Sequence, residues 1–464
     1  MSVFNQKKKF HFVGIGGIGM SGLAEILLSQ GHQVTGSDRQ LTEITDYLQK
    51  KGARIFAGHQ RKNLSPDVDF LIYSSAVPAD NPELQAAKEF GIPQMKRAQL
   101  LGQIFNRHFG IAVAGTHGKT TTTSMIGQIL LKAGLDPTIV VGGRLHNLMT
   151  NARLGQSDFM VTEADEYDRS FLTLFPRIAV VTSLEADHLD IYHDLADLQQ
   201  TFLQFVNQVT FDGLAVACAD DQNVRALIDK AAPTVITYGL QEGAQFQAKI
   251  LTSEANKITF EIYHRSQKLN QLTLNVPGQH NVLNALAAFV VGHELEIEHL
   301  LIVQALSEFK GVERRFDILV EKDGILAVDD YAHHPTEVAA TLQAARSGWQ
   351  KRLIAIFQPH LFSRTRDFYQ EFANVLKAAD HVIINKIYPA REEPMAGVSG
   401  KLISDQIGEK AIYIEQEEDL LNYLKKIVQA NDLVLFLGAG DIHYTAQRFA
   451  HWLEKNRAEH EQNA

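Results

Sequence analysis

Residues 112–123 read AVAGTHGKTTTT. The apolar residues 109–114 predict a buried strand, and a helix is expected over about 120–132. A glycine turn between a strand and a helix directs backbone N–H groups towards an anion. Val113 occupies the place of the first glycine in the common G-x-x-x-x-G-K-T spacing, so this turn reads G-x-x-G-K-T. The stretch, called loop 2 here, predicts an ATP site with the candidate residues Gly115, Thr116, His117, Gly118, Lys119, Thr120 and Thr121.

A second glycine turn, called loop 1, lies at residues 14–19 and reads GIGGIG. It follows a predicted strand and precedes a predicted helix, which is typical of diphosphate binding. Taken alone it also fits an NAD-dependent oxidoreductase, but such an enzyme leaves loop 2 unexplained. Asp38, Ser74 and Ser75 end two later strands at the edge where open α/β sheets bind ligands. The candidate residues of this site are Gly14, Gly16, Gly17, Gly19, Asp38, Ser74 and Ser75.

The composition is that of a large globular protein. The chain has 464 residues, is 45% hydrophobic and carries a formal net charge of -10. This charge argues against nucleic acid as the main partner. Cys218 is the single cysteine, so an intramolecular disulfide or a cysteine metal cluster is excluded. The N-terminus does not read as a signal peptide and no apolar run predicts a membrane span, so we expect a cytoplasmic enzyme.

The order of elements predicts α/β architecture in three domains. Short apolar runs alternate with amphipathic stretches, which is typical of parallel sheets covered by helices. Residues 257–278 instead predict two β-strands with a polar turn. We place the boundaries near 106 and 313, which gives domains of residues 1–106, 107–313 and 314–464.

Acidic and histidine side chains follow two predicted strands beside loop 2. Glu163 comes directly after residues 159–162, and His188 lies in the segment after residues 178–182. The acid on a strand next to a phosphate loop commonly helps to hold Mg²⁺. We therefore predict a Mg²⁺ or Mn²⁺ site formed by Thr120, Glu163 and His188.

Nine segments together resemble one family. They are HFVGIGGIGMSGLAE, VAGTHGKTTTT, EADEYDRSFL, EADHLD, GQHNVLNALAA, ERRFD, DDYAHHPTE, QPHLFSRTRDF and LGAGDI, and they span nearly the whole chain. The sequence resembles the Mur ligases, ATP-dependent amide-forming enzymes of peptidoglycan synthesis. The resemblance implies an N-terminal Rossmann-like domain for a UDP-sugar, a central ATPase-like domain and a C-terminal Rossmann-like domain. It also implies that loop 1 holds the diphosphate of UDP, not NAD.

The same resemblance implies roles for further residues. Asn281 and Asn284 match asparagines near ATP, and Asp330 matches an acid that holds the ATP ribose. Arg315 matches an arginine near the phosphates. His333 and Arg364 match positions near the incoming amino acid, where they are candidates for the proton acceptor and the carboxylate-binding cation. With these the candidate catalytic residues are Lys119, Glu163, His188, Arg315, His333 and Arg364.

Within the family, the motifs favour the branch that joins L-alanine to UDP-N-acetylmuramate. We expect a monomer or weak homodimer. Two positions depart from that branch. Leu361 stands where many relatives carry arginine, and Tyr167 where serine is frequent. A related recycling ligase, which attaches a tripeptide to the same UDP-sugar, also shows EADEYD and remains an alternative. A non-catalytic nucleotide switch is another.

Overall fold

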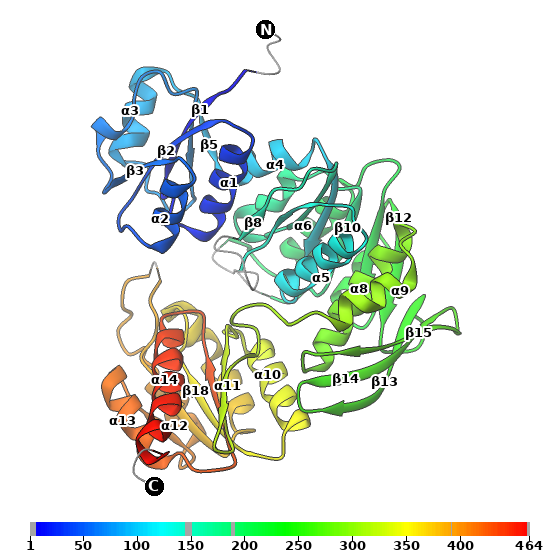
Figure 1. Ribbon diagram of the computed structural model, residues 1–464, viewed down its shortest axis with the longest axis vertical. Coiled ribbons are helices and arrows are strands. Elements are labelled where there is room, and N and C mark those ends of the chain that lie inside the picture. The colour runs from blue at the N-terminus through cyan, green and yellow to red at the C-terminus, as the bar shows by residue number, and fades with distance from the viewer. Residues whose placement is uncertain (1–5, 144–150, 187–190, 391, 462–464) are drawn as a thin grey trace. The chain divides into compact units, whose positions relative to one another are not determined.

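The structure is a computed structural model that describes residues 6–143, 151–186, 191–390 and 392–461. The described residues form three sheets of five, ten and six strands, each flanked by helices (Figure 1). The chain divides into two compact units. The first consists of residues 1–249, 261–272 and 283–309, and the second of the remaining residues. The predicted α/β class with three domains is confirmed, whereas the boundaries near 106 and 313 stay a prediction.

The first sheet has the strand order β3-β2-β1-β4-β5 and all its pairs are parallel. The chain order reverses at β1, so the carboxyl ends of β1 and β4 flank the crevice where such sheets bind ligands. The elements are β1 (Lys9–Val13), α1 (Ile18–Ser29), β2 (Gln33–Asp38), α2 (Glu43–Lys50), β3 (Arg54–Ala57), η2 (Arg61–Asn63), β4 (Phe70–Tyr73), α3 (Pro82–Phe90), β5 (Gln94–Lys96) and α4 (Arg97–Phe105).

Helix α3 shows how local sequence fixes an element. The Asn81 side chain accepts a hydrogen bond from the Glu83 N–H, and Pro82 occupies the first helical position. Gly91 ends the helix with φ of 68°, a conformation that glycine adopts without a steric penalty. The cap, the proline and the final glycine therefore determine where this helix begins and ends.

The second sheet has the order β15-β14-β13-β12-β11-β10-β6-β9-β7-β8. Its central strand β6 lies between β10 and β9 and is buried along most of its length. The two strands predicted within residues 257–278 are confirmed as β14 and β15. The elements are β6 (Phe109–Ala114), α5 (Lys119–Lys132), β7 (Thr138–Val140), β8 (Ala152–Arg153), β9 (Phe159–Glu163), η3 (Tyr167–Thr173), β10 (Ile178–Val181), α6 (Leu195–Val206), β11 (Leu214–Cys218), α7 (Gln222–Ile228), β12 (Thr234–Gly239), β13 (Phe246–Glu254), β14 (Lys257–His264), β15 (Gln267–Leu274), α8 (Gln279–Glu294) and α9 (His299–Ser307).

The third sheet has the order β16-β17-β21-β18-β19-β20. Among the strands described for this sheet, the edge strand β16 alone runs antiparallel to its neighbour. Apolar cores cover both of its faces, so the central strands read as continuous apolar runs. The elements are β16 (Asp317–Lys322), β17 (Ile325–Asp330), α10 (Pro335–Gly348), β18 (Arg352–Phe357), α11 (Phe362–Leu376), β19 (His381–Ile384), α12 (Lys401–Ile407), β20 (Ala411–Tyr413), α13 (Glu417–Ile427), β21 (Asp432–Leu437) and α14 (Ile442–Glu461).

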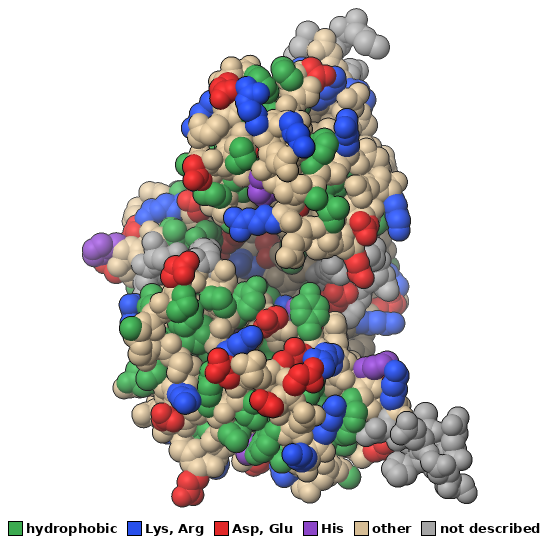
Figure 2. Space-filling model, turned by 90° about the vertical axis from the view of Figure 1, so that its left-hand side faces the viewer, with side chains coloured by type: hydrophobic (Ala, Val, Ile, Leu, Met, Phe, Trp, Pro, Cys, Tyr) green, Lys and Arg blue, Asp and Glu red, His purple; other side chains and the backbone are tan. Residues whose placement is uncertain are grey.

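The surface carries charges of both signs. Figure 2 shows Lys and Arg side chains interspersed with Asp and Glu side chains on one face. Among the described residues, no helix combines the length and the apolar character needed to cross a membrane.

Candidate nucleotide-binding and ligation site

Loop 1 connects β1 to α1 and is tied to the end of β2. Gly14 has φ of 81°, which favours glycine. The N–H groups of Gly14 and Ile15 donate to the Ser37 carbonyl at 2.8 and 3.1 Å. The Gly16 N–H donates to the Asp38 carboxylate at 2.8 Å. Asp38, which the sequence places near the ligand, therefore also braces the loop that would receive a diphosphate.

Ser74 and Ser75 follow β4, the strand beside β1. The Ser74 carbonyl accepts a hydrogen bond from the Val77 N–H at 3.0 Å, which closes a turn. A Val77 methyl lies 4.0 Å from the place that a Cβ on Gly14 would take. The two predicted parts of this site, loop 1 and the serine turn, are thus brought together at the carboxyl edge of the sheet.

Arg97 lies over the first turn of α1, a contact that the sequence reasoning missed. Gly17 is the N-cap of α1, and a Cβ added to Gly19 would come within 3.0 Å of the Arg97 side chain. The Nη2 of Arg97 also lies 3.6 Å from an Asp165 carboxylate oxygen. A cation therefore lies between loop 1 and the acidic segment after β9. In the sequence, the adjacent basic residues Lys96 and Arg97 at the start of α4 could have indicated this cation.

Loop 2 connects β6 to α5 and is tied to the chain after β10. Gly115 and Gly118 have φ of 143° and 82°, so the backbone conformation at both positions favours glycine. The Thr116 N–H donates to the Ser183 carbonyl at 3.0 Å, and the His117 N–H donates to the Ser183 hydroxyl at 2.9 Å. These contacts fix the shape of the loop at the start of α5, and a helix N-terminus favours an anion.

Asn284 on α8 supports loop 2 from behind. A Cβ on Gly118 would lie 2.5 Å from the Asn284 Oδ1. The same oxygen accepts a hydrogen bond from the Thr122 hydroxyl at 3.2 Å. Thr120 and Thr121 occupy the first turn of α5 and are buried. The predicted asparagine is therefore a neighbour of the loop, although it is 166 residues away from Gly118 in the chain.

Lys119 is paired with Glu166, a residue that the sequence reasoning did not single out. The Lys119 Nζ lies 2.9 Å from both carboxylate oxygens of Glu166. Burial raises the pKa of the Glu166 carboxyl to about 7, although the Lys119 charge opposes that shift. Burial alone would lower the pKa of the Lys119 ammonium, but the carboxylates around it, Glu166 foremost, raise it. The pair is an ionic contact in a largely dehydrated place.

Glu163 ends β9 beside β6, as the sequence predicted for a metal-binding acid. Its carboxylate accepts a hydrogen bond from the Gly142 N–H. A threonine hydroxyl and a carboxylate are the oxygen ligands that Mg²⁺ prefers, so Thr120 and Glu163 fit that ion by their chemistry. His188, the third predicted ligand, lies outside the described residues.

The second unit gathers the predicted ribose acid, arginine and histidine around Tyr331. The Asp330 carboxylate accepts hydrogen bonds from the N–H groups of Phe316 and Ala332 at 2.7 and 2.8 Å, and burial raises the pKa of this carboxyl. The Arg315 guanidinium lies 5.1 Å from the centre of the Tyr331 ring. A cation from the segment before β16 and an acid at the end of β17 therefore lie beside Tyr331.

Glu337 on α10 connects His333 to Arg315 and was also missed. The His333 Nδ1 lies 3.0 Å from the Tyr331 carbonyl oxygen and 3.2 Å from a Glu337 oxygen. The other Glu337 oxygen lies 3.6 Å from Arg315 Nη1. Because oxygen atoms surround Nδ1, that nitrogen carries the proton, and Nε2 is the basic nitrogen of His333.

Three further predicted positions also lie in the second unit. Arg364 is buried in the first turn of α11, and the preceding Leu361 is the N-cap with φ of 69°. Asn281 donates from Nδ2 to the Pro277 carbonyl at 2.6 Å. This hydrogen bond holds the side chain of Asn281 on the segment that leads into α8.

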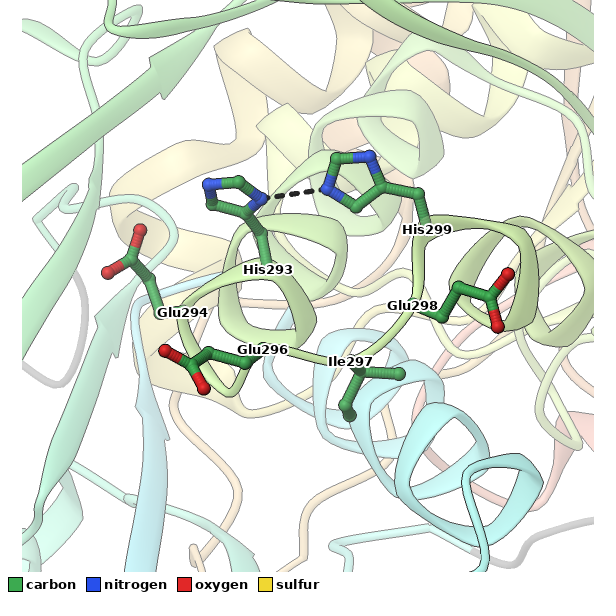
Figure 3. A pocket seen from close by; sticks show the side chains of 6 residues that line it. All are labelled: His293, Glu294, Glu296, Ile297, Glu298 and His299. Atoms are coloured by element: carbon green, nitrogen blue, oxygen red, sulfur yellow. Dashed lines mark hydrogen bonds between the residues drawn. The ribbon is translucent and has the colours of Figure 1, made fainter.

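A pocket of about 550 Å³ lies at the turn from α8 to α9 (Figure 3). Its lining residues are His293, Glu294, Glu296, Ile297, Glu298 and His299. The two histidine rings point towards one another, with His293 Nδ1 and His299 Nε2 at 2.8 Å. None of these residues belongs to the predicted site.

Three family descriptions match successive parts of the chain. They are the Mur ligase family catalytic domain at residues 9–109, the Mur ligase middle domain at 113–292 and the Mur ligase glutamate ligase domain at 314–440. A UDP-N-acetylmuramate–L-alanine ligase of Syntrophotalea carbinolica is 46% identical over 457 residues, which is 98% of this chain and 100% of that protein. The chain belongs to the Mur ligase family. The resemblance drawn from the motifs is thereby confirmed.

Solved Mur ligase structures agree with this assignment. A UDP-N-acetylmuramate-alanine ligase from Thermotoga maritima has a TM-score of 0.83 and 33% identity, covering 97% of this chain and 99% of that one. A murein peptide ligase from Psychrobacter arcticus has a TM-score of 0.70 and 26% identity, covering 97% and 99%. The Mur ligase fold is shared with both, and the similarity is higher for the alanine ligase.

Proposed function

We propose that this chain joins L-alanine to the carboxylate of UDP-N-acetylmuramate, using ATP and giving ADP and phosphate, in peptidoglycan precursor synthesis. The observation that carries the proposal is loop 2, with Lys119 at the start of a buried helix, in a chain of this family. L-Alanine as the amino acid is supported by two alanine ligases that match over nearly the full length, one by its sequence and one by its crystal structure.

The chemistry explains why a ligase of this kind needs two anion sites. A carboxylate is a poor electrophile, so one of its oxygens first attacks the γ-phosphorus of ATP, and ADP leaves. The alanine nitrogen then attacks the acyl carbon, phosphate leaves, and the nitrogen loses a proton. The first step brings two anions together, so rate enhancement depends on positioning and on cations. Lys119 and Arg315 are the side chains proposed to supply positive charge.

A divalent metal fits this proposal as a cofactor. Thr120, Glu163 and His188 are the residues proposed to hold Mg²⁺ or Mn²⁺, and the ion would supply positive charge to the phosphate oxygens. The hydroxyl and carboxylate oxygens of the first two residues suit that role.

The amine of alanine must be neutral when it attacks. We assign His333 as the proton acceptor through Nε2, because its Nδ1 faces the Tyr331 carbonyl and the Glu337 carboxylate. Glu337 stabilises the imidazolium that forms, as a carboxylate does behind a catalytic histidine. Arg364 is proposed to bind the alanine carboxylate through a two-point contact.

One assay tests the proposal against its alternatives. Phosphate release is measured with ATP, Mg²⁺ and UDP-N-acetylmuramate against L-alanine, L-serine, glycine and the recycling tripeptide. The proposal predicts the highest kcat/KM with L-alanine. Preference for the tripeptide would establish the recycling reaction instead. ATP binding without phosphate release would establish a nucleotide switch, and substrate-dependent NADH consumption would establish an oxidoreductase.

Location and assembly follow from the same proposal. ATP and UDP-sugars as substrates support a cytoplasmic enzyme, and the buried free Cys218 suits a reducing compartment. We propose a monomer or weak homodimer, which sedimentation at two protein concentrations tests.

A further inference from the structure

The Lys119 ammonium is surrounded by acceptors. Besides the two Glu166 oxygens at 2.9 Å, its Nζ lies 2.5 Å from the Gly115 carbonyl oxygen and 3.3 Å from that of Thr116. An ammonium group has three protons to donate. All of them are directed to the loop and to Glu166, so a phosphate oxygen must replace one of these acceptors to bind Lys119.

Glu166 is held in place by its backbone. Its carbonyl oxygen accepts hydrogen bonds from the Tyr192 hydroxyl at 2.5 Å and from the Arg169 N–H at 3.0 Å. Asp168 and Arg169, which follow it, have φ of 55° and 53°, a conformation that non-glycine residues adopt only when neighbours enforce it. Arg169 is fixed in turn by both oxygens of Asp197 at 2.6 and 2.8 Å. Glu166 is therefore built into a rigid turn.

The pair has two possible purposes. A carboxylate can neutralise the charge of a buried lysine, and in that case Glu166 would contribute only to the stability of the fold. Yet Glu166 is 2% exposed, and its carboxylate places negative charge beside the lysine that is proposed to bind ATP. Like charges repel strongly where water is excluded. Without this carboxylate the site would bind ATP more tightly. ATP affinity therefore does not explain why Glu166 is there, which indicates a second role for this residue.

We propose that Glu166 is a positioning residue for the ligation reaction: its carboxylate holds the Lys119 ammonium against the loop carbonyls, weakening ATP binding while fixing Lys119 where the transferred phosphoryl group passes. The proposal rests on the proposed ATP-dependent function. It predicts that ground-state binding and turnover respond in opposite directions to the loss of this charge, because only interactions stronger in the transition state raise kcat.

The test is Glu166→Gln, which keeps the size of the side chain and removes its charge. ATP binding is measured by calorimetry, and kcat by alanine-dependent phosphate release. We expect the dissociation constant of ATP to fall by about tenfold, because a repulsive charge is removed. We expect kcat to fall by about tenfold or more, because Lys119 loses its anchor. Unchanged or weaker ATP binding by folded protein, or an unchanged kcat, would overturn the proposal.

Two other variants keep the test decisive. Tyr192→Phe loosens the same turn without changing its charge, and tighter ATP binding by this control would overturn the proposal. If Glu166→Gln does not fold, Glu166→Asp retains the charge but is shorter by one methylene. It should lower kcat without tightening ATP binding, and wild-type kcat would count against the proposal. Failure of the wild-type protein to bind ATP would instead contradict the proposed function.

Discussion

Replacement of Lys119 by methionine should separate the chemical role of this residue from its structural one. Methionine fills a similar volume but leaves the Glu166 carboxylate, 2% exposed, without its ion-pair partner. Breaking a buried pair by removing one member costs about 3–5 kcal/mol. For domains of about 150–250 residues, a loss of about 1 kcal/mol in the free energy of unfolding lowers the melting temperature by roughly 2–4 °C. We therefore expect Lys119→Met to lower the melting midpoint of the domain that carries loop 2 by about 10 °C.

The double variant Lys119→Met/Glu166→Gln provides the matched control. It removes both charges together, and such a replacement is often close to neutral for stability. The melting midpoint of the double variant should therefore return most of the way from that of the single variant to that of the wild type. Phosphate release should be absent in both variants. Differential scanning calorimetry and a phosphate assay measure the two effects. A single variant that melts like the wild type, or a double variant that melts below the single one, would refute the reasoning.

Three further outcomes are expected. Gly118→Ala should weaken ATP binding at least about tenfold, because its Cβ would lie 2.5 Å from Asn284, whereas Gly134→Ala, with φ of 76° and open space, should leave ATP binding unchanged. Asp38→Ala should raise the KM for the UDP-sugar about tenfold by removing the acceptor of the Gly16 N–H, with no effect on the KM for ATP. Burial lowers the pKa of His293 below its usual value of 6.5, so the unfolded chain binds more protons and stability is lost as pH falls below about 6.5. In denaturant titrations from pH 7 to 5, His293→Gln should flatten that loss; an unchanged slope would exclude the histidine as its cause.

Closely spaced motifs predicted the main features of the fold well. Strand 109–114 has the predicted bounds, and helix α5 begins one residue before the predicted start. Both follow from local rules, because an apolar run and a glycine turn act through their own backbone. The position of Asp38 at the end of a strand could likewise be derived from the chain order. Its hydrogen bond to loop 1 could not, because that contact depends on how β2 pairs with β1.

Two glycine turns, each between a strand and a helix on its own α/β sheet, and the motif set of a Mur ligase could be read from the amino-acid sequence alone. These features are encoded by residues close together in the chain, where spacing fixes geometry. Which charged side chains pair with one another became known only from the folded chain, as in the contacts of Lys119 with Glu166 and of Arg97 with Asp165. Such pairings depend on how distant elements pack together and on burial, which changes the pKa of each group and the strength of its interactions. Neither can be derived from the spacing of residues along the chain.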